Sequence, residues 1–240
     1  MGLSKLISTE YPGRLILIGK SLNRDVVVCY FISGRSPSSQ ARRLVKNDKE
    51  QKIYVEPTDE KVLKQGDPEL LIYPAIMIGN GIAVSNGKQS RDMKYNFAEN
   101  ENELLALVNS LDGWEYEPDG PIYTPRISGC IFDNAYLSII KKQEVNIHQY
   151  FQIPLIKGKG KWIATYDGVN KNPVPSFSGE PRDIALPFNS AEETGKAIYD
   201  SLSPENGKPD LRVSLACVFK SNVSGDLSIY IKNRYDEETN

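Results

Sequence analysis

The chain has 240 residues, of which 40% are hydrophobic and 25% charged, a composition typical of a globular protein. Its 29 basic and 31 acidic residues give a formal net charge of −2, which argues against a polyanionic partner such as a nucleic acid. No apolar run approaches the roughly 20 residues of a membrane span, and the N-terminus lacks the apolar stretch of a signal peptide, so we expect a cytoplasmic protein.

Short apolar runs typical of β-strands dominate the first part of the chain. Arg14–Lys20 and Val26–Ser33 flank a turn-like segment, 21–25, and this pattern predicts a hairpin. Four more strands are predicted over 52–56, 69–72, 75–78 and 82–85. The Asn-Gly pair at 80–81 predicts a tight turn between the last two. The polar stretch 40–66 predicts an insertion or a mobile loop.

The second part combines strands with two helices. Apolar residues at helical spacing predict a helix over 100–111, with Asn100 or Asn102 as its N-cap. Ser190, three residues before a glutamate, is a capping-box signature that predicts a second helix over 190–202. Strands are predicted over 126–132, 135–141, 145–153, 162–166, 212–220 and 226–233. Loops are predicted over 113–125 and 167–187.

The order of these elements predicts the fold class. Two strand-rich blocks are each followed by a helix, and hairpins connect the strands throughout. This arrangement is typical of an α+β fold in which helices cover antiparallel sheets. We expect a single domain over residues 1–240.

The cysteines and the histidine point to no metal or thiol chemistry. Cys29, Cys130 and Cys217 each lie in an apolar run, which predicts buried structural thiols. His148 is the only histidine, and the alternating segment around it predicts a packed or solvated side chain in a strand. No CxxC or HExxH motif is present, so we expect no metal site.

Two strand ends carry polar residues suited to binding an oxyanion or a carbonyl group. The turn after the second strand contains Ser33, Arg35 and Ser36, where backbone N–H groups and a guanidinium could receive an oxyanion. Asn86 follows the strand 82–85, and its amide could donate to a carbonyl. The alternative for both segments is an ordinary surface turn.

A third candidate lies in the predicted loop 113–125. Tyr116, Glu117 and Asp119 are followed closely by Arg126, which gathers phenol, carboxylate and guanidinium groups before a strand. Loops on rigid scaffolds often carry functional sites, although solvated charges are the alternative. Tyr73, which precedes a proline, is a core aromatic or a further site residue.

These segments occur in a fixed order over roughly residues 11–170: YPGRLILIG, YFISGRS, YPAIMIGNGIAVSNG, YEPD, YTPRISG and ATYDG. In this order they resemble the archaeal-type inosine-monophosphate (IMP) cyclohydrolases. The resemblance implies a four-layer αββα sandwich like that of the N-terminal-nucleophile (NTN) hydrolases. It also implies an enzyme of purine biosynthesis that closes the ring of 5-formamidoimidazole-4-carboxamide ribonucleotide (FAICAR), giving IMP and water, with no cofactor.

The resemblance assigns roles to residues in the matching motifs. Glu117 is the candidate proton shuttle, and Tyr73 could polarise or orient the carboxamide. Arg35 and Asn86 could stabilise the oxyanion or hold the phosphate, and Arg126 could bind substrate or shape the site. The same motifs supply three more candidate substrate-binding residues, Ser36, Tyr30 and Tyr166.

Two other functions remain as alternatives. Met1 and Gly2 provide no Cys, Ser or Thr at the N-terminus, which disfavours amide hydrolysis by a terminal nucleophile. An amidohydrolase with an internal nucleophile, Cys29 or Ser33, is the second hypothesis, and a non-catalytic nucleotide-binding module is the third. The expected partner is a small nucleotide, with neither nucleic acid nor membrane, and the family suggests a homo-oligomer.

Overall fold

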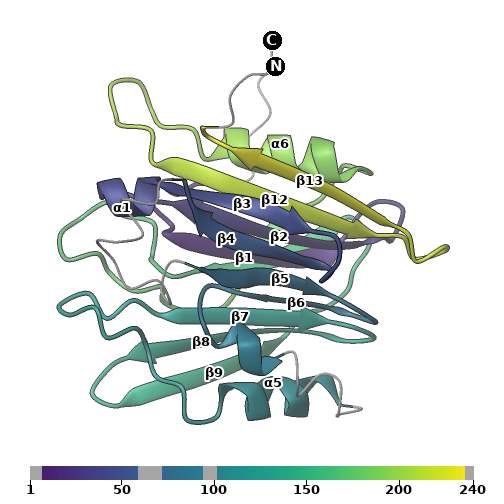
Figure 1. The fold of residues 1–240 in the computed structure, drawn as a ribbon, viewed down its shortest axis with the longest axis horizontal. Helices are drawn as coiled ribbons and strands as arrows, with labels where there is room; N and C mark the ends of the chain where they lie inside the picture. The colour runs from purple at the N-terminus through teal and green to yellow at the C-terminus, as the bar shows by residue number, and fades with distance from the viewer. Residues whose placement is uncertain (1–6, 59–71, 94–101, 236–240) are drawn as a thin grey trace.

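The computed structural model describes residues 7–58, 72–93 and 102–235, and two antiparallel β-sheets make up most of this part (Figure 1). Within it, six strands form the first sheet in the order β11-β10-β1-β2-β12-β13, and seven form the second in the order β3 to β9. The first sheet contains β1 (Arg14–Lys20), β2 (Val26–Ser33), β10 (Lys159–Ala164), β11 (Arg182–Ala185), β12 (Arg212–Lys220) and β13 (Leu227–Asn233). The second contains β3 (Arg42–Asn47), β4 (Lys52–Pro57), β5 (Tyr73–Ile78), β6 (Ile82–Ser85), β7 (Arg126–Ile131), β8 (Ala135–Lys142) and β9 (Asn146–Gln152).

The two sheets pack face to face through apolar side chains. Tyr30 of β2 and Tyr73 of β5 join them directly, with 2.8 Å between the two hydroxyl oxygens. Ile18 of β1 lies against Gly129 of β7, where a Cβ atom would come within 2.9 Å of the Ile18 methyl group. The glycine therefore lets the sheets approach, and one contiguous core contains residues of both.

Helices cover the outer face of each sheet. The helix α6 (Ala191–Ser201) packs on β12 and β13, and α5 (Glu103–Leu111) packs on β7 and β8 at the opposite side of the molecule (Figure 1). Phe31 of β2 meets Tyr199 of α6 edge to face, at 6.1 Å between ring centroids. Among the described residues, no helix has the length and apolar character needed to cross a membrane.

The fold confirms the predicted α+β class and the hairpins β1–β2, β5–β6 and β12–β13. It also confirms the caps, because Ser190 Oγ accepts from the Glu193 backbone N–H and Asn102 accepts from the Leu105 N–H. The three cysteines are fully buried, as predicted. Their burial follows from their places on strands in the apolar interior.

Two predicted loops instead contain edge strands. The expectation of an insertion or mobile loop over 40–66 was wrong for the edge strand β3, whereas the strand predicted over 52–56 is confirmed as β4. The edge strand β11 lies inside the segment 167–187 predicted as a loop. An edge strand pairs on one side only, and only Leu44 of β3 and Ile184 of β11 are buried. One buried residue in a polar strand is too weak a pattern to separate it from a loop.

The predicted strand 69–72 lies mostly outside the described residues, and β5 begins at Tyr73, two residues earlier than expected. Pro74 lies inside β5, although proline lacks the N–H that a central strand uses. Its partner strand β4 shifts register between Ile53 and Tyr54, and Tyr54 is the residue opposite Pro74. This irregularity accommodates the proline. The short helix α1 (Pro37–Gln40), capped by Ser36, was not predicted.

Candidate active site

Polar residues from both sheets meet at one end of the strands. Antiparallel pairing places the start of β1, at Arg14, beside the end of β2, and Thr165 follows β10 at the same end. In the second sheet the pairing likewise brings the start of β7, at Arg126, beside the end of β6 and Asn86. Because the sheets are stacked, residues distant in sequence converge there.

A cavity of about 540 Å³ lies at these strand ends. The described residues that line it are Tyr11, Arg14, Arg35, Ser36, Ser39, Arg42, Asn86, Glu117, Asp119, Ile122, Thr124, Thr165 and Tyr166. Five of the eight residues predicted from the sequence are among them, and Tyr30, Tyr73 and Arg126 are not. A nucleotide-sized ligand is compatible with a volume in this range.

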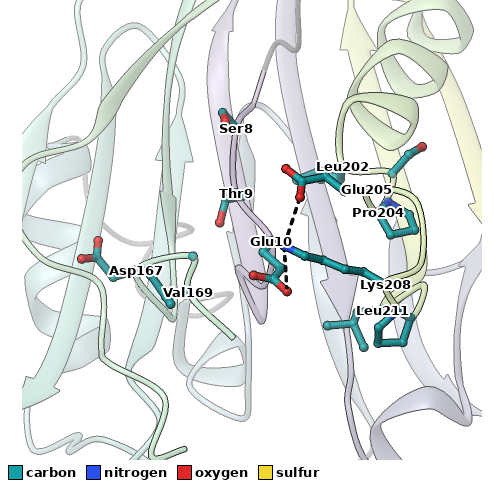
Figure 2. Close-up of a pocket in the computed structure, with 13 residues that line it drawn as sticks. Ser8, Thr9, Glu10, Asp167, Val169, Leu202, Pro204, Glu205, Lys208 and Leu211 are labelled. Carbon is teal, nitrogen blue, oxygen red and sulfur yellow. Dashed lines mark ion pairs between the residues drawn. The ribbon is translucent and has the colours of Figure 1, made fainter. Parts of the chain in front are cut away.

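A smaller cavity, of about 230 Å³, is lined by none of the residues predicted to form the site (Figure 2). Its charged groups are balanced within the protein, because Lys208 lies 3.7 Å from Glu10 and 3.1 Å from Glu205. The larger cavity differs in that its basic groups outnumber the carboxylates beside them.

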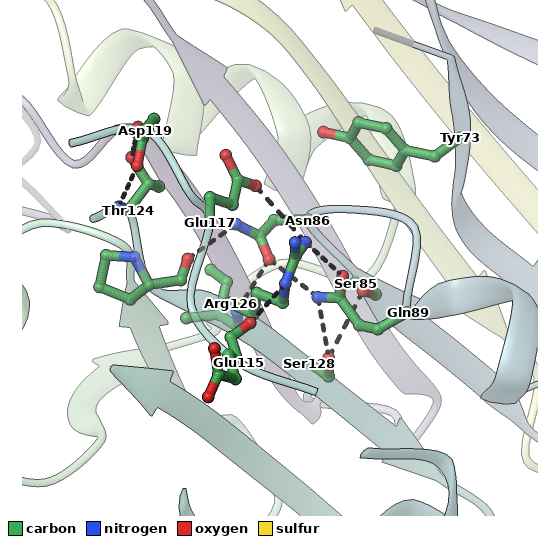
Figure 3. Close-up of polar contacts among 12 residues, drawn as sticks. Tyr73, Ser85, Asn86, Gln89, Glu115, Glu117, Asp119, Thr124, Arg126 and Ser128 are labelled. Carbon is green, nitrogen blue, oxygen red and sulfur yellow. Dashed lines mark hydrogen bonds and ion pairs between the residues drawn. The ribbon is translucent and has the colours of Figure 1, made fainter. Parts of the chain in front are cut away.

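Several groups of the protein contact the Arg126 side chain (Figure 3). Its Nε donates to the Glu115 carbonyl at 2.7 Å, and one terminal nitrogen donates to Gln89 at 3.2 Å. The guanidinium also lies over the Trp114 ring, 4.9 Å from its centroid. These contacts tie the loop before β7 to the segment after β6, so Arg126 shapes the site from behind its lining.

Glu117 is a largely buried carboxyl group that faces Arg126 across 3.8 Å (Figure 3). Its backbone N–H donates to the Thr124 carbonyl at 2.8 Å, which fixes the residue within the loop. Burial is the largest influence and raises the pKa of Glu117; Arg126 and Arg14 oppose the rise, and Asp119 adds to it. The net pKa is higher than usual, as expected of a group that exchanges protons near neutral pH.

Asn86 connects the turn after β6 to β7 (Figure 3). Its Oδ1 accepts from the Ile127 backbone N–H at 2.8 Å and from Gln89 Nε2 at 3.1 Å, and its Nδ2 donates to the Pro125 carbonyl at 3.0 Å. One N–H of the amide is not used in these bonds and is available to a ligand. Gln89, which no sequence pattern singled out, links Asn86 to Arg126.

Gly87 leaves room for this network. A Cβ atom there would lie 2.8 Å from an Arg126 nitrogen and 2.8 Å from Gln89 Oε1. Any side chain would therefore displace the groups that support Glu117.

Arg14 and Arg42 line the cavity, and sequence reasoning missed both. Arg14 donates one bond to the Ser33 carbonyl at 3.0 Å. The Arg42 side chain has no hydrogen bond or ion pair to any residue that the structure describes. The Nε atoms of both guanidiniums are buried without a partner. Arg14 stands in the opening YPGR motif, but Arg42 lies in the polar stretch 40–66, which offered no pattern to select it.

Burial and neighbouring groups shift the pKa values of both guanidiniums. Burial is the largest influence and lowers the pKa of Arg42, and the charge of Arg14 lowers it further. Burial also lowers the pKa of Arg14, but Tyr73 and Tyr30 raise it, with a net rise above its usual range. Two buried like charges with few acceptors favour an anionic ligand, which would supply the missing partners.

Arg35 forms the outer wall of the cavity. Its guanidinium lies 4.9 Å from the centroid of the Tyr11 ring and donates to Asn170 Oδ1 at 3.2 Å and the Lys171 carbonyl at 2.7 Å. Ser36 begins α1 and is bonded to Ser39 as a capping box. The turn predicted from the sequence thus faces the cavity.

A family model described as IMP cyclohydrolase-like protein matches residues 11–223. The chain belongs to this IMP cyclohydrolase-like family. No curated protein matches the chain. The match confirms the resemblance seen in the sequence and continues beyond residue 170. It includes all eight predicted site residues of this IMP cyclohydrolase-like protein, together with Arg14 and Arg42.

The raised pKa of Glu117 predicts how stability changes with pH. Folding that raises a carboxyl pKa adds stability while the group is protonated, and this contribution is lost as pH rises from about 4.5 through the raised value. Glu117→Gln stays neutral and does not lose this contribution. We therefore expect the difference in free energy of unfolding, variant minus wild type, to increase with pH by up to about 1.4 kcal/mol per pH unit in this window. Urea unfolding of both proteins between pH 4 and 8 measures the difference.

Glu180→Gln is the control for the loss of one surface charge, because Glu180 is exposed. A wild type that gains stability over Glu117→Gln as pH rises would contradict the assignment.

Proposed function

We propose that the protein is an IMP cyclohydrolase that closes the purine ring of FAICAR, giving IMP and water. The observation that carries this proposal is the presence of Glu117 in the same cavity as three arginines, Arg14, Arg35 and Arg42. A ring closure on a phosphorylated nucleotide needs an acid/base group and an anion site at a fixed separation. Membership of the IMP cyclohydrolase-like family supports this substrate class.

The reaction forms one C–N bond and releases the formyl oxygen. The carboxamide nitrogen attacks the formyl carbon and loses one proton, and the formyl oxygen passes through an oxyanion to a hydroxyl. That hydroxyl takes up the proton that the formamide nitrogen loses and leaves as water as the C=N bond forms. The Glu117 carboxylate takes the proton from the attacking nitrogen and returns it to the leaving oxygen.

Other residues stabilise charge during this sequence. The free N–H of Asn86 donates to the developing oxyanion, and the neighbouring cations lower its energy further. Tyr73 does not line the cavity, and its hydroxyl bonds to that of Tyr30 between the two sheets. Arg126 holds the loop that carries Glu117. In this assignment Arg14 and Arg42 bind the phosphate, while Arg35 and Ser36 line its outer wall.

The positions of the alternative nucleophiles argue against an amidohydrolase. Cys29 is fully buried and faces Cys217 of β12. Ser33 is 1% exposed and its hydroxyl donates to the Gly13 carbonyl at 3.1 Å. Neither residue lines the cavity. As part of the proposal, the fold is the four-layer NTN-hydrolase arrangement, which the placement of α5 and α6 on the outer faces of the two sheets supports. A cytoplasmic location and the lack of a cofactor stay predictions.

The anion site predicts a selective effect of Arg42. We expect Arg42→Met to weaken IMP binding by about 10- to 100-fold, because it removes a charged donor to the phosphate. Inosine, which lacks the phosphate, should bind both proteins alike. Isothermal titration calorimetry measures each affinity.

Arg43→Met is the matched control, since the neighbouring guanidinium is half exposed and lies 3.6 Å from Glu56. Its affinity for IMP should remain close to that of the wild type. An equal loss in the two variants would remove Arg42 from the phosphate site.

Glu117→Gln tests the proton shuttle. We expect kcat for FAICAR cyclisation to fall by about 10²- to 10⁴-fold, the usual worth of a general acid/base, while KM changes little. Glu115→Gln, in the same loop with an exposed side chain, should retain wild-type turnover. Undiminished turnover in Glu117→Gln would exclude this role, and a wild type that binds IMP without cyclising FAICAR would favour the non-catalytic alternative.

A further inference from the structure

Three residues of the cavity wall form a continuous hydrogen-bonded chain. Asp119 Oδ1 accepts from the Thr124 backbone N–H at 2.6 Å, and its Oδ2 accepts from the Thr124 hydroxyl at 2.5 Å. The Thr124 hydroxyl oxygen lies 2.8 Å from the hydroxyl oxygen of Tyr166. All three residues line the cavity of about 540 Å³.

The chemistry of the three groups fixes the direction of every bond in this chain. A carboxylate accepts hydrogen bonds and donates none, so the single hydroxyl proton of Thr124 is donated to Asp119. The Thr124 oxygen can then only accept from Tyr166, whose hydroxyl must be the donor. Burial raises the pKa of Tyr166 to about 12, which keeps its hydroxyl protonated at neutral pH. The Tyr166 oxygen is left with lone pairs and no proton to offer a ligand.

The Tyr166 ring is held in place from its other side. Tyr11 stacks on it, with 5.4 Å between the centroids and 29° between the planes. Arg35 in turn lies over the Tyr11 ring. The acceptor therefore has a fixed position in the cavity wall.

Tyr166 is linked through its neighbours to both Arg14 and Glu117, and all three line the same cavity. Thr165, the residue before it, exchanges two bonds with Arg14: its N–H donates to the Arg14 carbonyl at 2.9 Å, and its hydroxyl accepts from the Arg14 N–H at 3.1 Å. Thr124, its hydroxyl partner, accepts the backbone N–H of Glu117. In a nucleotide the pentose joins the phosphate to the base, and each of its hydroxyl groups can donate to such an acceptor.

We propose that Tyr166 is a specificity-determining residue that accepts a hydrogen bond from a pentose hydroxyl of the nucleotide, and that Asp119 and Thr124 are positioning residues that fix the direction of its own hydroxyl. This inference rests on the proposed function, because it takes the ligand to be a ribonucleotide. It adds the means by which the site selects a ribose over a deoxyribose.

Binding of IMP, 2′-deoxy-IMP and 3′-deoxy-IMP by calorimetry tests the proposal. We expect the wild type to bind IMP at least about tenfold more tightly than one of the deoxynucleotides. In Tyr166→Phe this preference should disappear, because IMP loses about tenfold in affinity while that deoxynucleotide is unaffected. Phenylalanine keeps the stacking on Tyr11, and thermal unfolding checks that the variant is folded.

Asp119→Asn provides a second variant at an exposed position. The asparagine amide would donate to Thr124, which would then donate to Tyr166, and the Tyr166 hydroxyl would point toward the ligand as a donor. The pentose hydroxyl would then have to accept instead of donate, so we expect the preference for the ribonucleotide to change in this variant of the same size. A purely structural role would not change this ratio of affinities.

The outcomes separate this inference from the proposed function. A wild type that cyclises FAICAR but binds all three nucleotides equally contradicts the inference alone. So does an equal loss of affinity for all three nucleotides in Tyr166→Phe, or a preference that is unchanged in both variants. A wild type that binds none of the nucleotides contradicts the proposed function and the inference with it.

Discussion

The cost of burying charged side chains at the strand ends is the constraint on which this site depends. Arg14, Arg42, Glu117 and Arg126 lie near one another, and each needs partners to compensate for lost hydration. The protein supplies Arg126 with several partners, a carbonyl, an amide, a ring and a carboxyl group. It leaves Arg14 and Arg42 short of acceptors, which an anionic ligand would complete.

Because their partners differ, arginines that look alike in the sequence have different roles in the site. Arg126 is part of the frame that positions Glu117, and burial raises the pKa of Glu117 against the charge of Arg126. Arg14 and Arg42 instead line the cavity with buried Nε atoms that have no partner, so they can contact a phosphate. The Tyr30–Tyr73 hydroxyl pair, buried between the sheets, joins β2 to β5. The chain of Asp119, Thr124 and Tyr166 connects the loop of Glu117 to the segment that follows β10.

Much of the fold could be predicted from the sequence, because central strands are apolar and helix caps have local signatures. The hairpins and the caps at Asn102 and Ser190 depend on neighbouring residues, and they were found. The edge strands β3 and β11 were missed, since their stability comes from pairing with one neighbour and not from their own pattern. Glu117, Asn86 and Arg35 were placed in ordered motifs, but Arg42 and Gln89 acquire their roles only when distant strand ends meet. No local sequence pattern predicts that contact.

A crystal structure of the protein with IMP tests the central claim most directly. The account predicts that the phosphate contacts Arg14 and Arg42 and that the base lies beside Glu117, within the cavity of about 540 Å³. A phosphate bound by Arg126, or a nucleotide seated in the smaller cavity beside Lys208, would contradict it.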